Sequence, residues 1–218
     1  MTTEYNFDPE SYSGLDKLGR IPLSRDFHMR EFLYSEIAVH YGIKNIPTNI
    51  DLAVKSGRQL CQLLLDPLQD AFGRIHIRSG YRSPNVNLTG VGKHNCAEDN
   101  DGAHTWDFKD KYGHGCGAMA CISIPHLSKL VLSGNADASA IAWWIYDHLP
   151  EWSTIEFFST PSKEILFADE VAFNIGWHES PKRTITTWRG GQRNLHANIP
   201  DKSARELAWS KLLIKELD

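Results

Sequence analysis

The 218-residue chain is 41% hydrophobic and 23% charged, which are the proportions of an ordinary globular protein. A chain of this length can bury one sizeable core, and a second independent domain is not expected. The formal net charge of −4 argues against a general nucleic-acid binder, because such a protein carries a basic excess or a basic face.

The N-terminal segment and the apolar runs set the expected location. The first residues, MTTEYNFDPESYSG, lack the basic and apolar parts of a secretory signal. The longest apolar run, IAWWIY, is far too short to cross a membrane. We therefore expect the protein to be cytoplasmic in the cell that produces it, without membrane insertion. Association with a virion or release by lysis is the alternative.

The chain is expected to begin with an extended arm over residues 1–25, which are polar and rich in Gly and Pro. The run MREFLYSEIAVHYG that follows predicts a helix. Its glycine, Gly42, is the expected end of that helix, because glycine readily adopts the left-handed conformation that closes a helix.

A long helix is predicted next. Thr48 with Asp51 resembles a helix N-cap, and the leucine spacing that follows carries the helical pattern to about Ala71. Gly57 and Pro67 interrupt this pattern, so two shorter helices are the alternative.

Strand patterns dominate the rest of the chain. IHIRS alternates in the manner of a strand, GYRSPN supplies a turn, and ACISIP is a second short strand. DASAIAWWIYDHLP predicts a helix that ends at Pro150. Four strand-like runs follow with turn-length spacers: STIEFFST, KEILFADE, AFNIGWHE and RTITTWR. Ser203 with Glu206 opens a last helix that is expected to run through Leu217.

This order of elements predicts an α+β fold, in which N-terminal helices pack on a mainly antiparallel sheet. The expected organisation is the arm over residues 1–25, one domain over residues 26–199, and a C-terminal helix within residues 200–218 that packs on the same domain.

The stretch IHIRSGYRSPNVN, followed by Val91-Gly92, resembles the zinc D-alanyl-D-alanine carboxypeptidase family, which includes phage L-alanyl-D-glutamate endolysins and vancomycin-resistance D,D-peptidases. Members share a strand, a Ser-Gly-Tyr-Arg-Ser-Pro turn, an Asn and a Val-Gly pair. The resemblance covers residues 24–110, with a weaker match around residues 172–185. It implies a hedgehog/D,D-peptidase-like fold that holds one zinc ion through His, Asp and a second His, with an open position for water.

The resemblance also implies roles for residues of the turn. Arg82 is expected to face the site, where its forked and permanently charged guanidinium binds a substrate carboxylate or stabilises an oxyanion. Tyr81 and Ser83, on either side of it, are expected to contact the substrate. The alternative for Arg82 is a structural role, in which it holds the turn through backbone carbonyls.

The first metal ligand departs from the family pattern, Ser-x-His-x-x-Gly-x-Ala-x-Asp. When the pattern is anchored on Asp107, Asn100 stands where the ligand histidine is expected, and Asn is a poor zinc ligand. His104 is the expected replacement, provided that the backbone bends at Gly102, because residues three apart on a straight strand point to opposite faces. His94, in the preceding polar loop, is the alternative ligand.

The second histidine of the pattern lies on a late strand after an aromatic residue, and Trp177-His178 fits that description. Ile175 replaces the glutamate that would act as general base. Glu179 is the remaining candidate base, although strand alternation points it away from His178. The predicted site therefore consists of the metal ligands His104, Asp107 and His178 and the catalytic residues Arg82 and Glu179.

Other arrangements of the potential ligands stay open. Cys96, Cys116 and Cys121, with His104 and His114, are of zinc-ligand type, but their spacing matches none of the tight Cys-x-x-Cys patterns. A disulfide from Cys96 to Cys116 or Cys121 is the other alternative, in a protein that works outside the cytosol.

These observations predict a zinc-dependent peptidase that hydrolyses peptidoglycan stem peptides, as a D,D-carboxypeptidase or as an endolysin. Its expected partner is the peptidoglycan peptide, not a nucleic acid; virion proteins and further copies of the chain are left open. The alternative is a catalytically inactive module of peptidase fold that serves in binding or structure, such as a virion component. Asn100 and Ile175, which replace a ligand and a base, favour that alternative.

Overall fold

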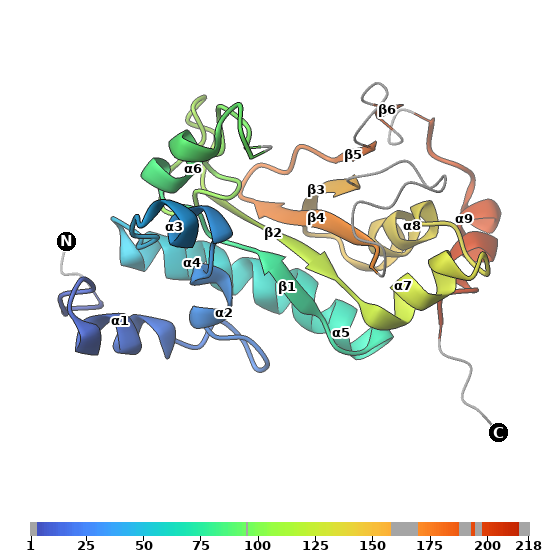
Figure 1. Cartoon of the computed structure of the whole chain (residues 1–218). Coiled ribbons are helices and arrows are strands. Elements are labelled where there is room, and N and C mark those ends of the chain that lie inside the picture. Colours follow the sequence, from blue (N-terminus) through green and yellow to red (C-terminus); the bar gives the residue numbers. More distant parts are fainter. Residues whose placement is uncertain (1–3, 95, 158–169, 188–192, 195–197, 214–218) are drawn as a thin grey trace. The chain divides into compact units, whose positions relative to one another are not determined.

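The computed structural model describes residues 4–94, 96–157, 170–187, 193–194 and 198–213 (Figure 1). The described part is a mixed α/β structure with a mostly antiparallel sheet. Its helical elements are α1 (Tyr12–Gly19), α2 (Arg30–Leu33), α3 (Glu36–Tyr41), α4 (Ile50–Leu60), the π-helix η1 (Cys61–Leu65), α5 (Asp66–Phe72), α6 (Pro84–Gly90), α7 (Pro125–Leu132), α8 (Ser139–His148) and α9 (Lys202–Trp209).

The strands form one sheet in the order β1-β2-β4-β3-β5-β6. Their bounds are β1 (His76–Ser79), β2 (Gly117–Ser123), β3 (Trp152–Phe157), β4 (Ala172–His178), β5 (Thr184–Thr187) and β6 (Arg193–Asn194). The predicted runs IHIRS, ACISIP, STIEFFST, AFNIGWHE and RTITTWR are therefore confirmed as strands, whereas KEILFADE lies outside the described residues except for its last residue. One pair departs from the antiparallel expectation, because β3 and β5 run parallel.

Residues 1–25 are not simply an extended arm, because they contain helix α1. Ser11 caps this helix by accepting a hydrogen bond from the Gly14 amide at 3.1 Å. Leu18 and Leu23 are 0% exposed, so this segment contributes to the core. The predicted helix that follows is divided into α2 and α3, because Ser35 interrupts it and caps α3. The left-handed Gly42 (φ 64°) ends α3 as predicted.

Helical structure is continuous from α4 through η1 to α5, which confirms the predicted long helix. Its N-cap is Asn49 rather than Thr48, because the Asn49 side chain accepts from the Leu52 amide at 3.0 Å. Pro67 stands in the first turn of α5, directly after η1. Proline lacks an amide hydrogen and collides with the carbonyl four residues earlier, and the wider π turn before it relieves both problems.

Two helices that the sequence did not predict, α6 and α7, begin at prolines. The turn predicted at GYRSPN leads into α6, which begins at Pro84 after the N-cap Ser83. Helix α7 begins at Pro125, directly after ACISI. Proline is favoured in the first helical turn, where its missing N–H would have no partner in any case. The last helix, α9, is capped by Asp201 rather than by Ser203, and it ends at Trp209.

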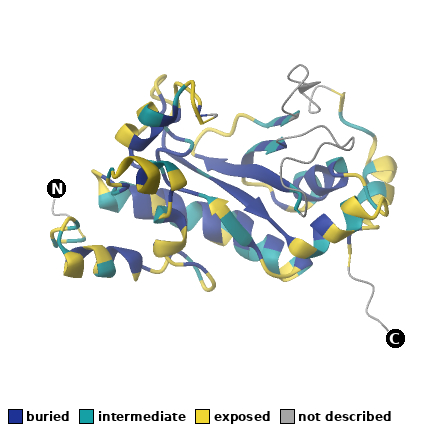
Figure 2. Ribbon diagram, viewed as in Figure 1, coloured by how far each residue is buried: buried dark blue, intermediate teal, exposed yellow. Residues whose placement is uncertain are grey.

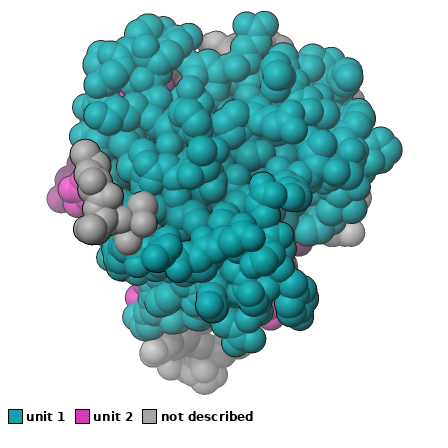
Figure 3. Space-filling model, turned by 90° about the vertical axis from the view of Figure 1, so that its left-hand side faces the viewer, with its two compact units in different colours: residues 1–62, 79–120, 176–180 teal, residues 63–78, 121–175, 181–218 magenta. Residues whose placement is uncertain are grey.

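The chain divides into two compact units, each made of three segments (Figure 3). The first unit comprises Met1–Gln62, Ser79–Ala120 and Gly176–Ser180, and the second comprises Leu63–Arg78, Cys121–Ile175 and Pro181–Asp218. This interleaving differs from the predicted contiguous domain over residues 26–199. Strands β2 and β4 each contribute residues to both units, so a boundary drawn at one point of the sequence cannot describe the division.

Residues of the central strands are buried along most of their length (Figure 2). Each unit also has its own pair of packed, buried aromatic residues. In the first unit, Trp106 packs against Phe32, with the ring centroids 5.2 Å apart. In the second, Phe72 packs against Trp144 with centroids 4.7 Å apart. The Asp147 carboxylate fixes α9 to α8 through an ion pair of 2.7 Å with Arg205.

None of the described helices combines the length and the apolar character that a membrane crossing requires. All four cysteines are buried and none of them forms a disulfide, so the disulfide alternative from Cys96 to Cys116 or Cys121 is not realised.

Candidate functional site

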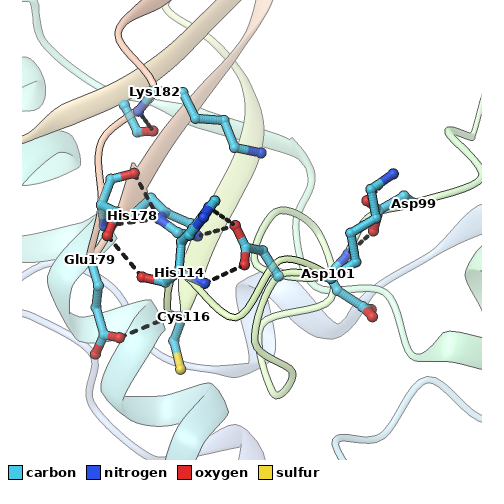
Figure 4. A network of polar contacts seen from close by, with 11 residues as sticks. Asp99, Asp101, His114, Cys116, His178, Glu179 and Lys182 are labelled. Atoms are coloured by element: carbon cyan, nitrogen blue, oxygen red, sulfur yellow. Dashed lines mark hydrogen bonds and ion pairs between the residues drawn. The ribbon is translucent and has the colours of Figure 1, made fainter.

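Three polar side chains of the first unit meet at the end of β4. Oδ2 of Asp110 lies 3.5 Å from Nδ1 of His114 and 3.8 Å from Nε2 of His178. The side chains of Asp110 and His178 are only 3% exposed, whereas that of His114 is 63% exposed. A buried carboxylate thus lies between one buried and one accessible imidazole, and Figure 4 shows the polar network around the two histidines.

The segment from Asp110 to Gly115 folds back on itself around that carboxylate. The His114 amide donates to Oδ1 of Asp110 at 2.7 Å, and the Asp110 amide donates to the Gly115 carbonyl at 2.9 Å. Both interactions are local, so they fix the carboxylate and the His114 backbone relative to each other.

The His178 ring is held by its own strand end. Its Nδ1 lies 3.0 Å from both the backbone nitrogen and the backbone oxygen of Ser180. When Nδ1 carries the proton and donates to that oxygen, Nε2 is left with a free lone pair directed at Asp110. Nε2 is buried and makes no hydrogen bond within the described structure.

Two glycines leave room beside this nitrogen. A Cβ atom added to Gly102 would lie 3.1 Å from Nε2 of His178, and Gly102 has a φ of +68°, which also disfavours any side chain. A Cβ atom added to Gly117 would lie 2.7 Å from Cδ2 of the same ring. The backbone therefore approaches His178 as closely as glycine permits.

Glu179, predicted as a catalytic base, is occupied elsewhere. Its Oε1 accepts from Nζ of Lys55 at 2.8 Å, and its Oε2 accepts from the Cys116 amide at 3.0 Å. Two hydrogen bonds hold the pKa of Glu179 below its usual range. The one from Lys55 has the larger effect, and the one from the Cys116 amide has the smaller. A carboxylate with a depressed pKa and both oxygens engaged is a weak proton acceptor, so the geometry disfavours the predicted role.

His104 and Asp107, the other predicted metal ligands, are buried in separate hydrogen bonds. Nδ1 of His104 lies 2.7 Å from the Gly80 carbonyl. Oδ2 of Asp107 accepts from the amides of Thr48 and Asn49 at 2.8 and 3.3 Å, at the start of α4. Asp107 thus serves as an acceptor at a helix N-terminus, where a carboxylate is stabilised.

No group of three or more His, Cys, Asp or Glu side chains among the described residues stands close enough to hold a metal ion without movement. The ligand set of His104, Asp107 and His178 therefore stays a prediction. Asn100, which displaced the expected first ligand, is buried and donates to the Asn87 side chain at 2.5 Å. The alternative ligand His94 interacts instead with the Tyr41 hydroxyl at 3.1 Å.

The residues of the Ser-Gly-Tyr-Arg-Ser-Pro turn have different surroundings. Tyr81 is 0% exposed and Ser83 is buried as the N-cap of α6, so both have a structural role, and their contact with a substrate stays a prediction. Arg82 is half-buried, and its guanidinium donates to the Ser79 hydroxyl and the Cys96 thiol at 3.2 and 3.4 Å. Neither contact is with a carboxylate, so these two contacts do not balance the positive charge of the guanidinium.

Asp110 was missed, and His114 was named only among the alternative ligand types, because the family pattern was anchored on Asp107. The same pattern can instead be aligned with its histidine on His114, because His114 and Gly117 have the His-x-x-Gly spacing. In this alignment Cys121 stands at the position of the ligand Asp. Gly117 begins β2, as expected of the residues that follow the first ligand. Tyr112, Met119 and Cys121 depart from the Ser, Ala and Asp of the pattern, which hides this alignment in the sequence. Asp110 precedes the motif, and no spacing rule identifies it.

The Asp107 carboxylate provides a test of its structural role. Burial raises its pKa, so the folded state holds the proton more tightly than the unfolded state. The contribution of Asp107 to the free energy of unfolding should therefore fall as pH rises from the usual aspartate pKa of about 3.9 through the raised value. Asp107→Asn retains an acceptor for the two amides and should abolish this decline. Asp107→Ala should lose about 1–3 kcal/mol by leaving buried donors unpaired. Urea unfolding of the three proteins between pH 3 and pH 8 is the measurement, and parallel curves for wild type and Asp107→Asn would contradict it.

Comparison of the chain with protein-family models, with curated proteins and with solved structures found no match.

Proposed function

We propose that the protein is a zinc-dependent peptidase acting on peptidoglycan stem peptides, with Asp110, His114 and His178 as its metal ligands. The substrate class comes from the resemblance of the SGYRSP region. The observation that carries the site is the position of the Asp110 carboxylate, 3.5 and 3.8 Å from nitrogens of the two histidines. This set replaces the predicted combination of His104 and Asp107 with His178.

The donor types fit zinc, and the two distances from Asp110 are near those of a zinc site, although the three side chains must move closer together to hold the ion. Two imidazoles and one carboxylate leave one position open for water, as in catalytic zinc sites. Two ligand atoms that are each about 2.1 Å from a tetrahedral ion lie roughly 3.4 Å apart. The distance from Asp110 to His114, 3.5 Å, is near this value, and the 3.8 Å to His178 must shorten by a few tenths of an ångström. The unpaired, buried Nε2 of His178 and the close glycine backbone favour the same assignment.

Each residue then has a definite task. Ser180 orients the His178 ring through Nδ1, which is how outer partners commonly fix a metal-binding imidazole. The Asp110 carboxylate, which lies between the two imidazoles, would offset part of the positive charge of the zinc ion. The accessible His114 faces solvent, from which a substrate can approach. Arg82 is proposed to bind the substrate carboxylate or an oxyanion. A bound zinc ion would supply an activated water and polarise the scissile carbonyl.

A catalytically inactive binding or structural module is the second candidate, and a specific observation favours it. Glu179 is held in an ion pair with Lys55, and Ile175, which stands in place of the family glutamate, is 0% exposed. Neither position therefore offers a carboxylate that is free to accept a proton.

The test is to measure zinc content and peptide hydrolysis on the same preparation. Purified protein is stripped with a chelator, reloaded with one equivalent of zinc, and incubated with muropeptides that end in D-alanyl-D-alanine or contain an L-alanyl-D-glutamate bond. Stoichiometric zinc and zinc-dependent release of one product class support the peptidase. Stoichiometric zinc without hydrolysis supports the inactive module. Failure to bind zinc at all rejects the proposed site.

A further inference from the structure

Glu179 connects two parts of the candidate site that are far apart in the sequence. Its side chain accepts from the Cys116 amide at 3.0 Å, and its own amide donates to the Cys116 carbonyl at 2.9 Å. Both polar groups of the Cys116 backbone are thus bound to one residue. Cys116 follows His114 by two positions, so the end of β4 holds the segment that carries the accessible histidine.

The packing around the carboxylate is close. Gly115 has a φ of +136°, and a Cβ atom there would lie 2.6 Å from Oε2 of Glu179. Ser180 adds a second connection, because its hydroxyl donates to the His114 carbonyl at 2.8 Å. The three consecutive residues from His178 to Ser180 therefore contribute an imidazole to the site, hold Cys116, and hold His114.

Lys55, on α4, completes the arrangement by donating to Oε1 of Glu179 at 2.8 Å. The Lys55 side chain is 60% exposed and that of Glu179 is 34% exposed. Exposed ion pairs of this kind contribute little to global stability. The contacts of the Glu179 carboxylate with Lys55 and with the Cys116 amide are therefore better explained by a local effect than by global stability. That local effect is to hold the segment that carries His114.

We propose that Glu179 is a positioning residue, which fixes the segment from Asp110 to Cys116 so that His114 stands opposite His178. The importance of that geometry for metal binding rests on the proposed function. Glu179 acts here as a hydrogen-bond acceptor at Cys116 and exchanges no proton with a substrate. The glutamine variant separates the two roles, because an amide oxygen can still accept from Cys116 whereas an amide cannot act as a base.

The experiment compares Glu179→Ala, Glu179→Gln and Lys55→Met with the wild-type protein. The first readout is amide hydrogen exchange at residues 114–116 in metal-free protein, measured by NMR. The second is zinc affinity from competition with a chromophoric chelator. Glu179→Ala should speed exchange of the Cys116 amide at least about 10-fold and weaken zinc binding about 10- to 100-fold, the usual effect of losing an outer partner. The melting temperature should change little.

Glu179→Gln should restore most of the exchange protection and the zinc affinity, and Lys55→Met should fall between the two glutamate variants. Unchanged exchange and unchanged zinc affinity in Glu179→Ala would overturn the proposal. So would a glutamine variant that keeps its protection and zinc affinity but loses hydrolysis as completely as alanine, because that pattern identifies a base. If wild-type protein binds no zinc and Glu179→Ala still loosens residues 114–116, the metal function fails and the positioning role stands.

Discussion

His178→Ala is expected to weaken zinc binding by more than about 100-fold, which exceeds the 10- to 100-fold effect typical of outer partners. The imidazole supplies a buried nitrogen that makes no hydrogen bond within the described residues. Asp110→Asn should weaken binding as well, because it removes the charge that lies between the two histidines. The measurement is chelator competition at pH 7.5, with circular dichroism to verify that each variant is folded.

The control is a pair of substitutions in the ligands predicted from the sequence. His104→Asn keeps a donor at the position of Nδ1 for the Gly80 carbonyl, and Asp107→Asn keeps an acceptor for the two amides at the start of α4. Both variants should bind zinc as the wild type does. If either of them loses zinc to the same degree as His178→Ala while staying folded, the assignment to Asp110 and His114 is wrong and the original ligand set regains support.

Much of the secondary structure could be predicted because the local signals agree with the tertiary context. IHIRS, STIEFFST and AFNIGWHE alternate or are continuously apolar, and all three form strands. The parallel pairing of β3 with β5 could not be predicted. Short spacers between strand-like runs favour antiparallel hairpins between consecutive strands. In the sheet, however, β4 lies on one side of β3 and β5 on the other, so β5 does not pair with the strand that precedes it in the chain.

The candidate site was predictable only in part, for a physical reason that Asp107 illustrates. The sequence shows only how many positions separate the aspartate from a histidine. Hydrogen bonds between distant segments decide whether the carboxylate can bind a metal ion. Asp107 is held by amides at Thr48 and Asn49, more than fifty positions away in the chain. His178 was identified because Trp177 and the surrounding strand are local signals. His114 and Asp110 lie in a glycine-rich turn whose fold depends on contacts with the end of β4.

Trp106 belongs to the aromatic core of the first unit, and Trp106→Ala should destabilise the protein by about 3–5 kcal/mol. Trp106 is 0% exposed, and its ring packs against Phe32 and Tyr81 with centroids 5.2 and 6.2 Å away. Its indole N–H donates to the Met119 carbonyl at 3.1 Å, which connects the segment before the site to β2. Removing the ring leaves a large cavity and an unpaired carbonyl. Urea unfolding should show a lower midpoint with a similar slope.

A second substitution shows whether the loss comes from this packing. A Cβ atom at Gly57 would lie 2.8 Å from Cζ3 of Trp106, so Gly57→Ala should destabilise the wild-type protein through overpacking. In the Trp106→Ala background the two close ring atoms are gone and only Cδ1 of Leu23, 3.2 Å from the added Cβ, stays close. Because Leu23 can move into the space left by the ring, the change should become neutral or stabilising by up to about 1 kcal/mol, since alanine favours a helix over glycine. The two changes should therefore be strongly non-additive, as expected of residues in contact. Additive losses would mean that the indole ring does not pack on α4 at Gly57, and that the destabilisation of Trp106→Ala has another origin.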